Sequence, residues 1–223
     1  MGVAEVNRSA IGLLGGSFDP IHNGHVQLAR DALTELDLAR IHILPAAQPW
    51  QKSRIEAPPE HRAQMVQLAI ATVPGLALDM HEIERGGATY TIDTVRALRR
   101  HTPEVPIVLI MGSDQWSRFD TWHEWNEIAD TAHIAVARRA GVDLPISLAL
   151  QTLLESRRGN VADLQTQPGG KVLQFGMTPI DASSTEVRQL LSEPQTGQNR
   201  LRLSAMVPAA VLDYIDSHHL YRD

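Results

Sequence analysis

The sequence contains no cysteine among its 223 residues. Disulfide bonds are therefore excluded, and so are structural zinc sites built on thiolates. No apolar run approaches the roughly 18 residues that a membrane-spanning helix requires. The first residues also carry too short an apolar run for a signal peptide. Together these absences predict a cytoplasmic protein in a reducing compartment, with no membrane as a partner.

Positive charge is also scarce. The chain has 20 lysines and arginines against 26 aspartates and glutamates, a formal net charge of −6. A nucleic-acid-binding protein would normally show a basic face, so nucleic acid is not expected as a partner. A small anionic ligand stays compatible with this charge, because it needs only local positive potential. The apolar content of 43% is ordinary for a globular protein.

The most informative segment is the decapeptide GSFDPIHNGH at residues 16–25. It follows an apolar run at 11–15, which predicts a buried strand, and precedes apolar residues at helical spacing over 26–33. At such a strand-to-helix turn, free backbone N–H groups and the positive helix end favour a bound anion. His22 and His25 are three residues apart and are expected to share one helix face. The segment therefore predicts a phosphate site.

Three other uses of this segment fit less well. It lacks the G-x-G-x-x-G spacing of dinucleotide-binding dehydrogenases, and G-x-x-x-x-G-K-[ST] occurs nowhere in the chain. Zinc is a competing use for His22 and His25. However, H-x-x-H is not the H-E-x-x-H helix, and no cysteine is present to complete a structural site. Phosphate remains the favoured ligand.

The rest of the chain alternates between strand and helix patterns. Strands are expected at 41–44, 76–80, 105–111, 132–137 and 171–175, and helices at 60–73, 91–100, 146–157 and 208–220. This rhythm predicts an α/β fold, Rossmann-like, with a mostly parallel sheet and helices on both faces. We expect a single domain over residues 1–223, with an insertion at 141–170 containing a polar loop at 165–170. The segment 208–220 is expected to close the domain as a helix.

A second motif opens another predicted helix at Asp181–Arg188. Asp181 or Ser183 fits an N-cap, and Ser183 with Glu186 fits a capping box. The remaining side chains offer more than a cap requires. The hydroxyls of Ser184 and Thr185, with the guanidinium fork of Arg188, suit a polyphosphate.

At this point the chain resembles a known family. Residues 16–25, with Ser183-Ser184-Thr185-x-x-Arg188, resemble the two signatures of the H-x-G-H nucleotidyltransferases. Residues 45–52, PAAQPWQK, resemble the P-x-x-x-P-P-H-K loop of bacterial nicotinate-nucleotide adenylyltransferases, and 89–94 is similar to their S/T-Y-T-x-x-T segment. Gln51 stands where that loop usually has histidine, and Trp50 where it has proline.

The resemblance implies an enzyme that transfers AMP from ATP to nicotinate mononucleotide, giving deamido-NAD and pyrophosphate. Its partners would be these two substrates, its Mg²⁺ would be carried on the ATP phosphates without protein metal ligands, and a homo-oligomer is compatible with it. The alternatives are a sister adenylyltransferase acting on nicotinamide mononucleotide or phosphopantetheine, and a non-catalytic nucleotide sensor. A sensor would be expected to lose His22, His25 or Arg188, and all three are present.

The resemblance also assigns residues to roles. The catalytic residues would be His22, His25 and Arg188. The ATP-binding residues would be Gly15, Gly16, Ser17, Phe18, His22, His25, Gly112, Asp114, Ser184, Thr185 and Arg188. The nicotinate mononucleotide-binding residues would be Lys52, Thr89, Tyr90, Trp122 and Arg139. Gly112 and Asp114 directly follow the strand expected at 105–111, and ligands of parallel sheets bind beyond such strand ends.

Overall fold

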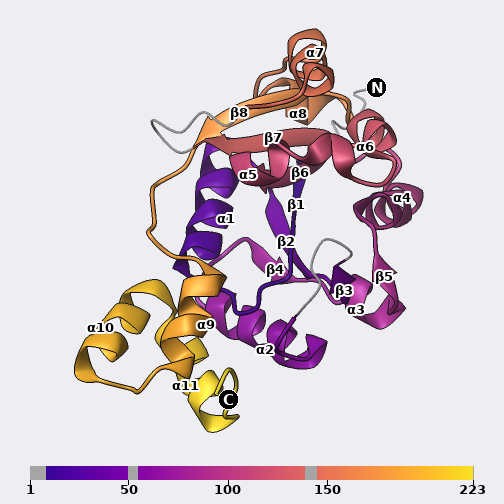
Figure 1. Ribbon diagram of the computed structural model, residues 1–223. Coiled ribbons are helices and arrows are strands. Elements are labelled where there is room, and N and C mark those ends of the chain that lie inside the picture. The colour runs from indigo at the N-terminus through magenta and orange to yellow at the C-terminus, as the bar shows by residue number, and fades with distance from the viewer. Residues whose placement is uncertain (1–8, 50–54, 139–144, 223) are drawn as a thin grey trace.

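Six parallel strands form a central sheet in the computed structural model, which describes residues 9–49, 55–138 and 145–222 (Figure 1). These strands are β1 (Ile11–Gly16), β2 (Arg40–Pro45), β4 (Leu76–Leu78), β6 (Ile107–Gly112), β7 (His133–Arg138) and β8 (Val172–Gly176). Their spatial order is β4-β2-β1-β6-β7-β8, and every pairing is parallel. This is the order of a doubly wound sheet, so the Rossmann-like α/β prediction is confirmed.

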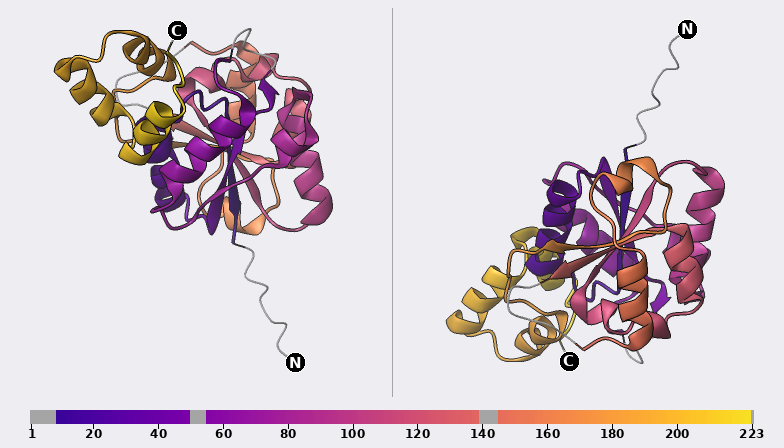
Figure 2. Two further views of the ribbon diagram at one scale, coloured as in Figure 1. Left: turned by 90° about the horizontal axis from the view of Figure 1, so that it is seen from below. Right: turned by 90° about the horizontal axis from the view of Figure 1, so that it is seen from above.

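Helices cover both faces of the sheet (Figure 2). One face packs against α1 (Asn23–Glu35), α2 (Pro59–Ile70), α9 (Ser184–Ser192), α10 (Gly197–Met206) and α11 (Ala209–Ser217). The other packs against α4 (Thr91–His101), α6 (Trp125–Thr131) and α7 (Leu148–Ser156). Shorter elements are α3 (His81–Arg85), α5 (Ser113–Trp116), the 3₁₀ turn η1 (Phe119–Thr121), α8 (Asp163–Thr166), and a separate strand pair, β3 (Gln48–Pro49) with β5 (Ala88–Thr89). No described helix is long and apolar enough to cross a membrane.

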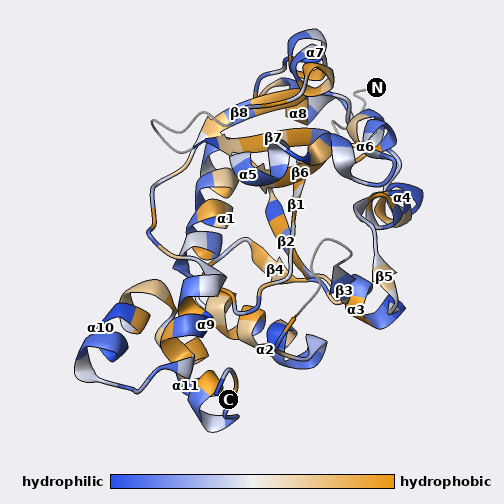
Figure 3. Ribbon diagram, viewed as in Figure 1, coloured by the Kyte–Doolittle hydropathy of each residue, from blue (hydrophilic) through white to orange (hydrophobic). Residues whose placement is uncertain are grey.

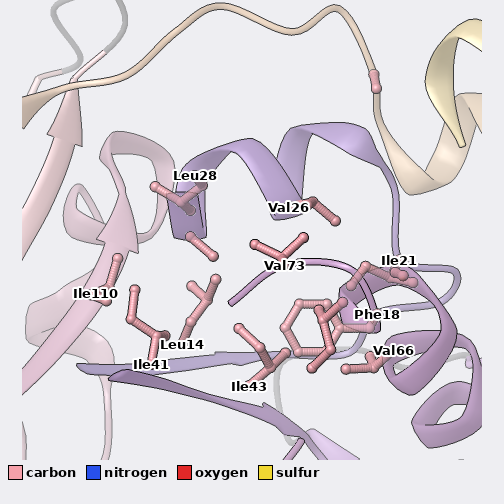
Figure 4. Close-up of a cluster of buried hydrophobic side chains, with 14 of the residues drawn as sticks. Leu14, Phe18, Ile21, Val26, Leu28, Ile41, Ile43, Val66, Val73 and Ile110 are labelled. Atoms are coloured by element: carbon pink, nitrogen blue, oxygen red, sulfur yellow. The ribbon is translucent and has the colours of Figure 1, made fainter. Parts of the chain in front are cut away.

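The strands are apolar because both of their faces are buried. Successive residues of β1 enter different cores: Leu13 packs with the α4 side and Leu14 with the α1 side. Strands β6 and β7 are buried along most of their length, and Figure 3 shows that their residues are largely hydrophobic. In the core on the α1 side, Leu14 of β1 and Ile43 of β2 lie in the same cluster as Val66 of α2 (Figure 4). Phe18 extends this core to the end of β1, where the decapeptide begins.

Most of the expected elements are present, and the differences have local causes. The strand expected from residue 105 begins at Ile107, since Pro106 has no N–H to donate to a ladder. The prediction of a loop over 165–170 is wrong for its first residues, because α8 extends from Asp163 to Thr166. The helix α10 was not predicted. Its sequence, GQNRLRLSAM, buries only Leu203 and Met206, too few apolar positions to give a helical period.

Strands β1 and β6 lie at the centre of the sheet, where the strand order changes direction, and they separate toward their carboxyl ends. Pairing between β1 and β6 runs from Ile11 opposite Ile107 to Leu13 opposite Leu109. The outer pairings continue about three residues further, to Gly16 in the β1–β2 pair and Gly112 in the β6–β7 pair. Two neighbouring strands whose carboxyl ends diverge in this way form the crevice where doubly wound folds bind ligands.

Gly12 tests how tightly β1 is packed in the middle of the sheet. A Cβ at this position would lie 2.8 Å from both Ile110 Cδ1 and Ile41 Cγ1. We expect Gly12→Ala to lower the free energy of unfolding by about 1–3 kcal/mol, because the added methyl group overfills the core. Urea denaturation measures the change.

Gly176→Ala is the matched control, since no heavy atom lies within 4 Å of a Cβ there. Its stability is expected to stay within about 0.5 kcal/mol of the parent. Equal stability of the two variants would contradict the packing described for β1.

Candidate active site

Two histidine rings are stacked at the start of α1. His22 is the N-cap of the helix, and its ring lies 3.7 Å from that of His25, with 28° between the planes. The backbone N–H of His22 donates to Nδ1 of His25 at 3.3 Å. A neutral imidazole carries one proton, so in this arrangement the proton of His25 sits on Nε2. His25 is thus prepared to donate a hydrogen bond from the far side of its ring.

Glycines allow these rings to approach the backbone. A Cβ on Gly24 would lie 3.0 Å from Nδ1 of His22, and one on Gly16 would lie 2.9 Å from Cζ of Phe18. Contacts this short would force the rings to move. The Phe18 ring in turn meets His25 edge-on at 5.1 Å between centroids. The glycines of the decapeptide are therefore needed for the placement of the aromatic and imidazole rings.

The first turn of α9 packs onto the turn between β1 and α1. Ser183 caps α9 by accepting from the N–H of Glu186, as its sequence indicated. The Ser184 hydroxyl donates to the Pro20 carbonyl at 2.9 Å, and Nη1 of Arg188 donates to the Asp19 carbonyl at 2.7 Å. The two motifs predicted to bind phosphate are thus brought together, although more than 150 residues separate them. Thr185 lies exposed in the same turn.

Asp19 is the centre of a buried hydrogen-bond network in this turn. The residue is only 2% exposed, and its carboxylate accepts from the N–H of Glu56 at 2.9 Å and of Ala57 at 3.1 Å. The Tyr221 hydroxyl donates to the same carboxylate at 2.8 Å. Burial, aided by the charge of Asp19, raises the pKa of the Tyr221 phenol above its usual range, so this hydroxyl stays protonated. One carboxylate thereby connects three distant segments.

Arg62 on α2 is fully buried and joins the decapeptide to the segments after β2 and before α2 through their carbonyls. It donates to Ser17 at 2.7 Å, to Ala47 at 3.1 Å and to Ala57 at 3.1 Å. Burial lowers the pKa of its guanidinium, while the nearby charge of Asp19 acts in the opposite direction. The decapeptide and the segments after β2 and before α2 are therefore held in fixed relative positions.

The end of β6 lies beside the end of β1, as the fold requires. Gly112 is the N-cap of α5, and Asp114 lies exposed in the first turn of that helix. Gly15 is exposed at the end of β1, with no heavy atom within 4 Å of a Cβ built on it. Asp114 is therefore accessible at the crevice, and Gly15 offers backbone that a ligand can approach.

Three of the residues expected to hold the acceptor are described, and they lie at or near the start of α4 and beside η1. Thr89 is buried, and its hydroxyl accepts from the N–H of Gln48 at 3.3 Å. Tyr90 is the N-cap of α4, and its ring lies 4.8 Å from that of His123. Trp122 packs edge-on against Phe119 at 5.5 Å. Two further residues of the set, Lys52 and Arg139, lie outside the described residues, as do Trp50 and Gln51.

Sequence reasoning missed several residues that organise this site. Glu56, Arg62 and Tyr221 were given no role, and Asp19 was read only as part of a motif. An arginine three residues into a helix or a tyrosine near the end of the chain gives no signal of its own.

Within the described part of the chain, no three histidine or carboxylate side chains are grouped so as to hold a metal ion.

The bond from Tyr221 to Asp19 can be tested by removing one oxygen atom. We expect Tyr221→Phe to lower the free energy of unfolding by about 1–3 kcal/mol, because a buried carboxylate loses one of its three donors. Thermal or urea denaturation measures the loss.

Tyr214→Phe makes the same change in a more exposed place, where the hydroxyl meets His61 Nδ1 at 2.9 Å. Tyr214→Phe is expected to lower the free energy of unfolding by less than about 1 kcal/mol. A Tyr221→Phe variant as stable as Tyr214→Phe would show that Asp19 does not depend on the phenol.

Comparison with known proteins identifies the family. Residues 13–190 match the family model described as Cytidylyltransferase-like. A protein of Marinobacter nauticus named "Probable nicotinate-nucleotide adenylyltransferase" is 41% identical over 182 residues, covering 81% of this chain and 84% of the relative. One of the same name from Bordetella avium is 40% identical over 213 residues, covering 95% and 98%.

The fold agrees with these relationships. The structure of Plasmodium falciparum nicotinic acid mononucleotide adenylyltransferase complexed with NaAD superimposes with a TM-score of 0.71 at 19% identity, covering 96% of this chain and 97% of that one. The structure titled "The Crystal Structure of a Putative Nicotinate-nucleotide Adenylyltransferase from Vibrio parahaemolyticus" gives a TM-score of 0.62 at 14% identity, covering 96% of both chains. The chain belongs to the nicotinate-nucleotide adenylyltransferase family of nucleotidyltransferases.

Proposed function

We propose that this enzyme transfers the adenylyl group of ATP to nicotinate mononucleotide, releasing pyrophosphate and forming deamido-NAD. One observation carries the proposal: Ser184 and Arg188 bond to the turn that ends in His22. Two helix starts, two imidazoles and a guanidinium are thereby gathered beside the crevice between β1 and β6. Relatives named for this reaction, 40% or more identical, support the choice of acceptor.

The chemistry needs no protein nucleophile and no general base. The 5′-phosphate of the acceptor is already anionic at neutral pH, so one of its oxygens attacks the α-phosphorus of ATP directly. The bond from that phosphorus to the oxygen bridging to the β-phosphate breaks, and its electron pair leaves on pyrophosphate. What the protein supplies is the alignment of two anionic substrates and stabilisation of the developing charge.

The proposed roles follow from position. His22 and His25 contact the ATP phosphates, and His25 donates from Nε2. Ser184, Thr185 and Arg188 hold the β- and γ-phosphates and the departing pyrophosphate, a task suited to a guanidinium fork.

The nucleoside and the acceptor occupy the two sides of the crevice. The backbone of residues 15–18 and of Gly112 lines the nucleotide, and Asp114 accepts from its ribose hydroxyls. Thr89, Tyr90 and Trp122 bind the pyridine nucleotide, together with Lys52 and Arg139. An indole or phenol ring is a suitable stacking partner for a pyridine face.

Mg²⁺ enters as part of the ATP substrate and is held by its phosphates and by water, a common mode for this ion. Its charge offsets that of the triphosphate, and the residues above act on the oxygens it leaves accessible. Because the reaction consumes ATP, we place the enzyme in the cytoplasm.

His25 gives the sharpest test of the phosphate site. We expect His25→Ala to lower kcat by about 10²–10³, because one donor to the developing charge is lost. The ATP dissociation constant should change much less, since that contact strengthens only as charge develops. Steady-state pyrophosphate release measures kcat, and calorimetry with MgATP measures binding.

His101→Ala serves as the control, because His101 ends α4 and bonds to the carbonyl of Ala97 in its own helix. It should retain the parent kcat. A folded His25→Ala variant with the parent kcat would remove His25 from the mechanism.

Acceptor choice separates this enzyme from sister adenylyltransferases. Nicotinate carries a carboxylate where nicotinamide carries an amide, so a site that offers N–H donors leaves one facing the amide NH₂ group. Such a mismatch costs about 1–3 kcal/mol, and more where charge is involved. We expect kcat/KM to favour nicotinate mononucleotide by at least about a hundredfold.

The measurement is pyrophosphate release with nicotinate mononucleotide, nicotinamide mononucleotide and phosphopantetheine in parallel. Equal use of both mononucleotides would contradict the specificity and leave adenylyl transfer standing. ATP binding without pyrophosphate release from any of the three would contradict the proposed function and indicate a nucleotide sensor.

A further inference from the structure

Arg188 is bound to a carboxylate in this structure. Its Nε donates to Oε1 of Glu56 at 3.0 Å, while its Nη1 donates to the carbonyl of Asp19. The side chain of Arg188 is 22% exposed and that of Glu56 is 33% exposed, so the pair is partly shielded from water. A glutamate therefore occupies one edge of the guanidinium that the proposed function gives to the ATP phosphates.

The geometry lets Glu56 leave without disturbing the site. Its backbone N–H is held by the Asp19 carboxylate at 2.9 Å, and the next N–H, of Ala57, is held by the same carboxylate. The main chain at this position is thus fixed independently of the side chain. The Asp19 carbonyl can likewise keep its bond to Nη1 while a ligand takes the Nε edge. Rotation of one side chain is enough to exchange Glu56 for a phosphate.

Charge favours that exchange when a polyphosphate arrives. Glu56 and Asp19 are two acids packed with two guanidiniums, Arg62 and Arg188. These four formal charges cancel, so the cluster presents little net positive potential while the ion pair is intact. An anion seated on Arg188 would also lie close to the Glu56 carboxylate, and like charges at short range repel.

We propose that Glu56 is a competing anion for Arg188, which weakens the binding of ATP and of the product pyrophosphate to the same degree. This inference rests on the proposed function, because it takes Arg188 as a phosphate ligand. Its consequence is that the enzyme holds the triphosphate less tightly than its cationic groups alone would allow. Pyrophosphate, which uses the same guanidinium, then leaves more readily.

Calorimetric titration of the full chain with MgATP, and separately with pyrophosphate, tests the proposal. We expect Glu56→Gln to bind both ligands about fivefold more tightly, the scale of a partly exposed ion pair. The parallel change matters, because ATP and pyrophosphate share only the phosphates held by Arg188. In an Arg188→Ala background the same substitution should tighten both ligands clearly less, because the competition is gone and only the like-charge repulsion remains to be relieved.

Glu186→Gln is the matched control, since Glu186 is a carboxylate on α9 itself, paired with Arg202 at 2.5 Å. It removes the same charge and should not tighten either ligand. Unchanged or weaker binding in Glu56→Gln would overturn the proposal, as would equal tightening in the Arg188→Ala background or in the control.

The Arg188→Ala variant alone separates this inference from the function it rests on. If Arg188→Ala binds ATP and pyrophosphate as the parent does, then the role of Arg188 in the proposed function is wrong, and competition for it is excluded. If Arg188→Ala weakens both ligands while Glu56→Gln tightens neither, the role of Arg188 stands and only the competition is wrong.

Discussion

The buried carboxylate of Asp19 is the interaction on which the rest of the site depends. It accepts from two consecutive backbone N–H groups, Glu56 and Ala57, and from the Tyr221 hydroxyl. A buried charge is costly unless it is well hydrogen-bonded. The Asp19 carboxylate therefore needs these donors, and in accepting from them it fixes the positions of their segments. Through them the turn after β1, the segment before α2 and the last residues described are joined. Arg188 completes the arrangement by bonding to the carbonyl of the same residue.

This network matters because of where the sheet places it. The strands β1 and β6 diverge after Leu13 and Leu109, and the turn carrying Asp19 follows β1 directly. A transfer between two phosphate-bearing molecules needs aligned substrates and stabilised charge more than it needs reactive side chains. The site has that character: two stacked imidazoles, the starts of α1 and α9, and a guanidinium, with Ser184 and Arg188 bonded to backbone carbonyls of the turn after β1.

The fold and the helix starts that carry the two motifs could be predicted from sequence because each rests on a local pattern. A continuous apolar run gives β6, and a glycine-rich turn followed by paired histidines gives the start of α1. The supporting network could not be predicted in the same way. Arg62 bonds only to main-chain carbonyls, which any residue could supply, and Tyr221 reaches Asp19 across 202 positions. Strands of two residues, such as β3 and β5, are too short to show a period.

Direct transfer between the two substrates, with no adenylyl group on the protein, is the central claim. Exchange of labelled pyrophosphate into ATP tests it, because an adenylyl-enzyme would allow that exchange with ATP alone. The account predicts no incorporation of label when nicotinate mononucleotide is absent, and rapid incorporation once it is added. Incorporation in the absence of any acceptor would contradict the claim and require a nucleophile on the chain.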